Sequence, residues 1–347
     1  MIVEGKIYKP PFPTYFMVYI YKKIVSGKPY YYLRVSERKG KRVIARDIAY
    51  LGNSVEEVRK SLDKKEYREK VRKAYKTIHN FVESNHWLEK VRELKLKKDD
   101  FLGEKLEEVE ACKLYYNNFF RKQEELTRKE ILKNFIIEFA FNTASIEGNT
   151  ITLQQARNLL ENGLTPENRT LREIYDLQNT EKVFFDIFDK REDLSHNFII
   201  QIHDSLLENI DARKGYRHTD IRVIKSNFDA TPGPYVKADM ELLLKWYFQT
   251  RDKLHPLVLA IIFHHKFEKI HPFMDGNGRT GRMLMNYILI KNNYPPLVIY
   301  KKTRTDYLEV LRKADKSDFT KYKKEDYSLL VQFIADEMIN SYWSIFL

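Results

Sequence analysis

The polar segment HPFMDGNGRTGR at residues 271–282 lies between two strongly apolar stretches, residues 256–270 and 280–292. Each flanking stretch is long enough and apolar enough to form a buried helix. Two buried helices joined by a polar loop need further helices around them to complete a core. The arrangement therefore predicts a mainly helical fold that carries a polar loop at its centre.

The composition of this loop is suited to binding phosphate. Gly276-Asn277-Gly278 allows backbone N–H groups to turn inward, because no Cβ atom blocks the approach of a ligand to the first and last of these residues. The helix that follows adds unpaired N–H groups and the positive end of its dipole. Arg279 and Arg282 lie three residues apart and carry forked donors that match phosphate oxygens. Asp275 can hold Mg²⁺, with phosphates and waters completing the shell.

A candidate base stands just ahead of the loop. A neutral imidazole at His271 can accept a proton from an incoming hydroxyl group. A lone histidine beside an apolar helix is usually structural, and Gly-Asn-Gly is common in turns. His264 and His265 add two more histidines, but no i, i+4 pair of ligands faces one way, which disfavours a histidine metal site. The joint order of base, acid, glycine loop and two arginines favours phosphate chemistry.

Residues 271–282 match the motif HPFxDGNGRxxR at every defined position, so the chain resembles the Fic (Fido) family from about Glu130 to Leu330. The resemblance implies a helical bundle with a β-hairpin flap. It also implies a protein adenylyltransferase, which moves AMP from ATP to a Ser, Thr or Tyr hydroxyl of a target protein. Relatives are commonly dimers, so the resemblance makes a homodimer an expectation.

The resemblance assigns a role to each motif residue. His271 would be the general base, and Asp275 would hold Mg²⁺ between the α and β phosphates. Arg279 would support the β-phosphate and Arg282 the γ-phosphate. The nucleotide-binding residues implied by the motif are Asp275, Gly276, Asn277, Gly278, Arg279, Thr280, Gly281 and Arg282.

The resemblance also points to positions outside the motif. Tyr307 lies where family members stack adenine on a tyrosine, although ordinary helix packing explains it equally well. Asp315 falls where animal relatives carry asparagine, which leaves the choice of base, and so a different nucleotide donor, open. The flap would be residues 221–225, an edge strand that aligns the target peptide by main-chain pairing. Its expected contact residues are Ile221, Arg222, Val223 and Ile224.

Residues 143–148, TASIEG, match the inhibitory pattern [S/T]xxxE[G/N] of the same family. A carboxylate in the last turn of a helix faces the negative end of the dipole, so Glu147 is easier to explain if a cation waits there. The resemblance names Arg282 as that cation and implies an ATP pose that is unproductive. The alternative is a surface glutamate before a glycine cap. Some relatives also use this glutamate to remove AMP, and that second activity stays open.

The N-terminal part of the chain has a different character. Residues 14–51 predict three β-strands joined by tight turns, forming a small domain over residues 1–53. Residues 54–126 are expected to form a charged helical linker, with the catalytic domain at 127–347 and Thr127 capping its first helix. Residues 1–50 hold eleven Lys/Arg against three Asp/Glu, a charge of +8 out of the chain's +12. This balance suits nucleic acid and raises a DNA-associated regulator as an alternative function, but a solvated basic sheet is favoured.

The sequence also bears on where the protein acts. No apolar run is long enough to predict a membrane-spanning helix. The N-terminus lacks a secretory pattern, and the single cysteine, Cys112, excludes an internal disulfide. We therefore expect a cytoplasmic protein.

Overall fold

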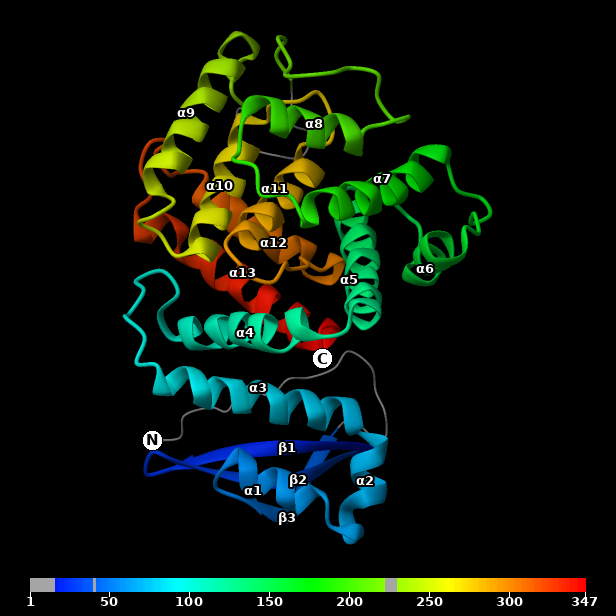
Figure 1. Ribbon diagram of the computed structural model, residues 1–347, viewed down its shortest axis with the longest axis vertical. Helices are drawn as coiled ribbons and strands as arrows, with labels where there is room; N and C mark the ends of the chain where they lie inside the picture. The colour runs from blue at the N-terminus through cyan, green and yellow to red at the C-terminus, as the bar shows by residue number, and fades with distance from the viewer. Residues whose placement is uncertain (1–15, 40–41, 222–229) are drawn as a thin grey trace. The chain divides into compact units, whose positions relative to one another are not determined.

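The computed structural model describes residues 16–39, 42–221 and 230–347, and it divides into two compact units. The first unit ends at Lys95 and the second begins at Leu96 (Figure 1). This division differs from the three expected segments. Residues up to 95 group with the N-terminal sheet, and residues from 96 onward group with the large helical unit.

The first unit is built on a three-stranded antiparallel sheet in the order β1-β2-β3, as the strand pattern predicted. Ser26 and Gly27 both have positive φ, 50° and 77°, which gives the tight two-residue turn that suits a twisted hairpin. The elements of this unit are β1 (Phe16–Val25), β2 (Lys28–Lys39), β3 (Arg42–Gly52), α1 (Val55–Leu62), α2 (Arg68–Lys73) and α3 (Tyr75–Glu93).

The helices of this unit cover one face of the sheet. Val55 and Val58 of α1 and Ile78 and Val82 of α3 are buried in a cluster with residues of all three strands. The prediction that the segment after residue 53 is a solvated linker is therefore wrong for these helices. Their few apolar residues recur at helical spacing, and a short apolar stripe is enough to close the core of a small sheet. Ser54 caps α1, because its Oγ accepts a hydrogen bond from the Glu57 backbone N–H at 3.2 Å.

The second unit is helical, which confirms the predicted fold class. Its helices are α4 (Leu106–Asn118), α5 (Glu125–Ile146), α6 (Leu153–Asn162), α7 (Leu171–Phe188), α8 (His196–Leu206), α9 (Val236–Thr250), α10 (Pro256–Ile270), α11 (Asn277–Lys291), α12 (Arg304–Ala314) and α13 (Lys324–Ile345). None of the helices in the described part of the chain combines the length and the apolar character needed to cross a membrane.

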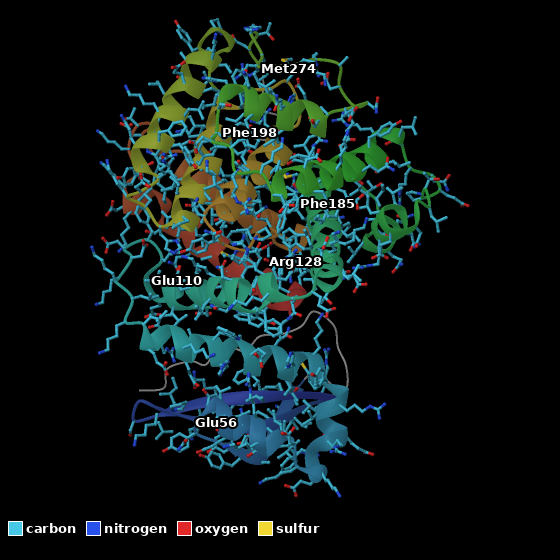
Figure 2. The ribbon with its side chains drawn as sticks, viewed as in Figure 1. Glu56, Glu110, Arg128, Phe185, Phe198 and Met274 are labelled. Atoms are coloured by element: carbon cyan, nitrogen blue, oxygen red, sulfur yellow. The ribbon has the colours of Figure 1, made fainter. Side chains whose placement is uncertain are left out.

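Helices α10 and α11 form the centre of this unit. Residues 257–263 of α10 are all 0% exposed, and most of α11 is buried as well. Phe198 of α8, labelled in Figure 2, packs on Tyr287 of α11 with ring centroids 4.6 Å apart. Because both helices are held by neighbours on several sides, the turn between them is fixed in position.

Local capping signals set some of the helix ends in this unit. Thr152 caps α6 in a full capping box, and Gly163 ends the helix with φ 69°. Thr127 does not cap α5, which begins two residues earlier after Glu124. Glu125 pairs with Lys129 at 2.5 Å one turn on, which supports the extra helical residues.

Candidate active site

The turn between α10 and α11 has a fixed shape. His271 ends α10 with a left-handed backbone (φ 52°), and Gly276 precedes α11 with φ 77°. A Cβ atom on Gly276 would lie 2.5 Å from Leu207 Cδ2, so glycine is required there by both conformation and space. Phe273 is 0% exposed and stacks on His203 with ring centroids 3.6 Å apart. The Asn277 side chain donates to the Phe273 carbonyl and accepts from its N–H, which closes the loop.

His271 is placed to act as a base. Its Nδ1 lies 3.3 Å from the Glu268 carbonyl oxygen. An Nδ1–H that donates to this oxygen leaves Nε2 as the basic nitrogen. Burial lowers the pKa of His271 below its ordinary value, and the Glu268 carbonyl and Glu147 only partly oppose this. The imidazole is therefore neutral at physiological pH and able to accept a proton.

Arg217 holds the turn around His271 from the other side. It is 4% exposed, and its Nε donates to the His271 carbonyl at 2.8 Å. Its other nitrogens donate to the carbonyls of Thr219 at 2.8 Å and Ile270 at 3.2 Å. One guanidinium therefore links the end of α10 to the chain that leads into the expected flap. Ile221 is the only one of the four expected flap contacts within the described residues, since Arg222, Val223 and Ile224 lie outside them.

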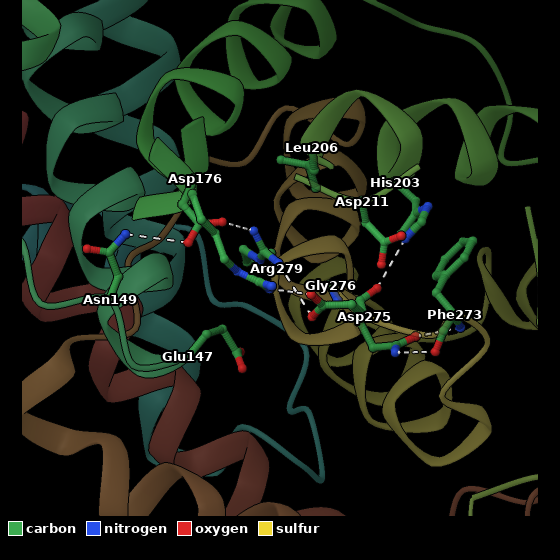
Figure 3. A network of polar contacts seen from close by, with 12 residues as sticks. Glu147, Asn149, Asp176, His203, Leu206, Asp211, Phe273, Asp275, Gly276 and Arg279 are labelled. Carbon is green, nitrogen blue, oxygen red and sulfur yellow. Dashed lines mark hydrogen bonds and ion pairs between the residues drawn. The ribbon is translucent and has the colours of Figure 1, made fainter. Parts of the chain in front are cut away.

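Two carboxylates and two arginines from distant parts of the chain meet at the start of α11 (Figure 3). Asp176 of α7 pairs with Arg279, whose side chain is 3% exposed. Arg279 also lies 3.6 Å from Asp275 Oδ1, and Arg172 pairs with the other carboxylate oxygen of Asp275. Burial alone would raise the pKa of Asp275, but Arg279 and Arg172 outweigh it and lower the pKa, so this side chain is a carboxylate.

The contact between Asp176 and Arg279 predicts a large stability effect. Both side chains are nearly buried, at 11% and 3% exposed, so Asp176→Ala removes the principal partner of a buried guanidinium. We expect the free energy of unfolding in urea to fall by about 3 kcal/mol. Asp186→Ala, an exposed position on the same helix, is the matched control and should change stability by less than about 0.5 kcal/mol. Equal effects of the two substitutions would contradict the assignment.

Glu147 lies against the first turn of α11. Its Oε1 accepts a hydrogen bond from Arg282 Nη2 at 2.6 Å, and it lies 2.1 Å from where a Cβ atom on Gly278 would be. Glycine at 278 thus allows the carboxylate to approach the backbone of the first helical turn. Burial would raise the pKa of Glu147, but Arg282, Arg279 and His271 together lower it. The predicted pairing of Glu147 with Arg282 is therefore present.

Thr143 fixes the other side of the same arginine. Its Oγ1 accepts from Arg282 Nε at 2.7 Å, and its carbonyl accepts from Nη2 at 3.2 Å. Both ends of the TASIEG segment therefore bind one guanidinium, whose side chain is 3% exposed. Helix α5 presents a threonine and a glutamate one turn apart, which is the spacing that brings two side chains to one face.

Glu268, a half-buried side chain, lies behind this site. Its Oε1 has no hydrogen-bond partner among the described residues, and it lies 3.9 Å from His264 Nδ1. Burial raises the pKa of Glu268 to about 8, although Arg282 opposes the shift. Burial also lowers the pKa of His264 to about 3, so that ring stays neutral and offers no cation to Glu268.

The raised pKa of Glu268 predicts how stability depends on pH. The carboxyl ionises more readily in the unfolded chain, so the folded state loses stability as pH rises from about 4.5 toward about 8. Glu268→Gln should therefore raise the free energy of unfolding by on the order of 2 kcal/mol at pH ~8.5 and little at pH ~5. Urea unfolding at both pH values measures this, with exposed Glu325→Gln as the control. A gain that is the same at both pH values would contradict the assignment.

The remaining predicted residues lie as follows. Tyr307 is 1% exposed and its hydroxyl contacts His264 Nε2 at 2.5 Å, which favours the packing role over adenine stacking in this conformation. Asp315 accepts a hydrogen bond from His265 at 3.1 Å. Thr280 is fully buried. Gly281 faces inward, because a Cβ atom there would lie 2.6 Å from Glu268 Oε1.

Several residues of the site were not predicted from the sequence, among them His203, which stacks on Phe273. Asp176 and Arg172 come from α7 and act on a loop about a hundred positions further along the chain. Glu268 lies between His264 and His271 in the sequence, and no motif around it predicts a role in the site. A buried carboxylate at an apolar helix position, as at Asp176, is the kind of signal that could have been noticed.

The fold and this geometry define a helical protein in which a glycine-containing turn brings together a neutral histidine and two arginines. Residues 193–289 match the Fic/DOC family. The matched stretch contains His271, Asp275 and both arginines.

Relatives and solved structures agree with this. The chain is 30% identical to Protein adenylyltransferase Fic of Drosophila grimshawi and 31% identical to that of Drosophila melanogaster, over 214 residues or 59% of the chain. The match covers 41% of each of these relatives, so the chain spans about two fifths of their length.

Two solved structures have the same fold. One is a Fic domain containing signaling protein from Bacteroides thetaiotaomicron, with 27% identity and a TM-score of 0.61, covering 67% of this chain and 94% of that one. The other is a Fic family protein from Desulfovibrio desulfuricans, with 26% identity and a TM-score of 0.59, covering 71% of this chain and 74% of that one.

Proposed function

We propose that this protein transfers AMP from ATP to a Ser, Thr or Tyr hydroxyl of a target protein, and that Glu147 holds the activity down. The support is the site geometry together with relatives named protein adenylyltransferase. One observation supports the proposal most strongly. A carboxylate, Glu147, already lies against Gly278 and Arg282, where a phosphate oxygen of a nucleotide would otherwise be held.

The proposed reaction uses residues whose positions the fold fixes. The target hydroxyl loses its proton to His271 as its oxygen attacks the α-phosphorus of ATP. The bond from that phosphorus to the bridging oxygen of the β-phosphate breaks, and pyrophosphate leaves. Backbone N–H groups at the start of α11, with Arg279 and Arg282, bind the phosphates that leave. This chemistry depends mainly on positioning and charge stabilisation.

Asp275 fits the expected magnesium ion. Its side chain is 32% exposed at the loop, and its lowered pKa keeps it ionised. The described residues hold no cluster of three or more His, Cys, Asp and Glu side chains that could form a protein cage. Mg²⁺ needs no such cage beside phosphates, because one carboxylate, phosphate oxygens and waters complete its octahedral shell. The bound ion would supply charge neutralisation on the phosphates of ATP.

The identity of the transferred group tests the proposal directly. The protein with Glu147→Gly is incubated with a target lysate, Mg²⁺ and ATP labelled at either the α or the γ phosphorus. We expect protein labelling from the α position alone. Labelling from the γ position would show a kinase reaction and overturn the proposal.

The donor base and the cellular setting complete the proposal. The residue at Asp315 leaves the choice of nucleotide base open. Competition by unlabelled ATP, GTP, CTP and UTP in the same assay shows which nucleotide the protein prefers as donor. We expect ATP to compete best. A homodimer, a cytoplasmic location and AMP removal assisted by Glu147 remain predictions from the resemblance and the single buried cysteine. A DNA-associated regulator in which this site is secondary is not favoured, because the expected acid and both arginines lie at one turn beside His271.

A further inference from the structure

The N-terminal sheet has two chemically different faces. Ile20, Leu33 and Leu51 point toward the helices of this unit and are at most 6% exposed. Because side chains alternate along a strand, the residues next to them in sequence point to the opposite face. That opposite face carries five tyrosines, with one lysine and one arginine among them, and Asp47 lies opposite Arg34 on it. We call it the tyrosine face, and its residues are Tyr19, Tyr21, Lys23, Tyr30, Tyr32, Arg34 and Tyr50.

The strand register aligns three of the tyrosines in a row. Tyr21 of β1 pairs with Tyr32 of β2, and Tyr32 pairs with Tyr50 of β3. The rings of Tyr32 and Tyr50 have centroids 5.4 Å apart, and Tyr30 lies 6.3 Å from Tyr50. The row therefore crosses the whole sheet, about 10 Å from the first strand to the third. Tyr50 is 52% exposed, so its ring offers a surface to a ligand.

Cations flank this row on both sides. The guanidinium of Arg34 lies 3.6 Å from the centroid of the Tyr21 ring, and Asp47 fixes it at 2.6 Å. Lys23 pairs across the strands with Tyr30. Residues 16–39 and 42–54 together contain eight Lys/Arg and two Asp/Glu, so the sheet as a whole is strongly basic.

We propose that the tyrosine face binds a single-stranded nucleic acid. Unpaired bases stack on aromatic rings with little dependence on sequence, and a basic surround meets the phosphodiester backbone. The row of tyrosine rings supplies the stacking surface, and Lys23 and Arg34 beside it supply positive charge. Stacking of this face on the same face of a second copy is disfavoured, because two strongly basic sheets repel each other. In a duplex the flat faces of the bases are covered by the neighbouring base pairs. The tyrosine face therefore fits a single strand better than a double helix.

Binding of a labelled oligonucleotide to the full chain tests the proposal. Fluorescence anisotropy is followed with a thymidine oligonucleotide of about 12 nucleotides at ~50 mM salt, and affinity should fall as salt rises. Tyr50→Ala should weaken binding at least about tenfold, and Tyr50→Phe, which keeps a ring, should restore most of it. Tyr75→Ala is the matched control, because Tyr75 is 61% exposed on α3 of the same unit and lies off the tyrosine face.

Several outcomes would overturn the proposal. They are no binding by the wild-type chain at low salt, tighter binding of a duplex of the same length, or equal losses from Tyr50→Ala and Tyr75→Ala. A dimer in light scattering that Tyr50→Ala dissociates would show that a second copy covers the face instead. Thermal unfolding of each variant shows that the unit is still folded. AMP transfer is expected to be unchanged by Tyr50→Ala, so failure here is separate from failure of the proposed activity.

Discussion

Replacing Glu147 by glycine is expected to raise the rate of AMP transfer roughly 100-fold, the scale on which one preorganised donor to a reacting phosphate acts. The substitution removes the carboxylate that binds Arg282 at 2.6 Å and lies against Gly278. Arg282 and the N–H groups of α11 then become available to the phosphates of ATP. The rate is measured from the transfer of α-labelled AMP to protein.

The control separates release of the site from a general effect of glycine. Glu104→Gly changes an exposed glutamate in a short 3-10 helix of the same unit and should leave the rate unchanged. Glu147 itself has φ −83° at the end of α5, a backbone that glycine adopts without strain. A Glu147→Gly protein that is folded by circular dichroism but no faster than wild type would show that the contact with Arg282 does not limit the activity.

Removing the imidazole of His271 is expected to lower the rate by roughly 10²- to 10⁴-fold in the Glu147→Gly protein. The reason is the loss of the neutral base, whose pKa is lowered by burial. Because the pKa of His271 is lowered, the rate of the Glu147→Gly protein should fall only at a more acidic pH than it would with a histidine of ordinary pKa. Initial rates across a pH series, at saturating ATP, measure both effects.

Two variants keep this test clear of folding effects. His271 has φ 52°, a left-handed backbone that asparagine tolerates better than alanine, so His271→Asn tests the base with less strain. His79→Ala, in the N-terminal unit, is the control for loss of a histidine. A rate that survives both His271→Ala and His271→Asn would mean that another group accepts the proton.

Some of the fold and the site could be predicted because the signals are local. Thr152 and Gly163 mark the ends of α6 through hydrogen bonds within a few residues. The glycines of the loop reflect local needs too, since Gly276 has positive φ and Gly278 a close neighbour. The pairing of Glu147 with Arg282 came from a pattern within one family and not from the residues alone.

Other features depend on contacts that no local pattern contains. The role of α1 and α3 in the sheet core depends on which apolar residues the sheet presents. The charged sequence of these helices alone therefore predicts a linker. Asp176 pairs with Arg279, which lies 103 positions away in the sequence. The residues next to either one contain no pattern that predicts this pair. The sequence position of Tyr307 is compatible with stacking on a ligand or with packing in the core. Its burial and its contact with His264 favour packing in the core.

We propose that the turn from His271 to Arg282 transfers AMP to a protein hydroxyl once the Glu147 carboxylate is removed. Peptide mass spectrometry of a lysate treated with the Glu147→Gly protein, ATP and Mg²⁺ tests it most directly. We predict a mass increase of one AMP unit on Ser, Thr or Tyr residues, which is absent when Glu147→Gly is combined with His271→Ala. A phosphate adduct, or unmodified peptides despite bound ATP, would contradict the account.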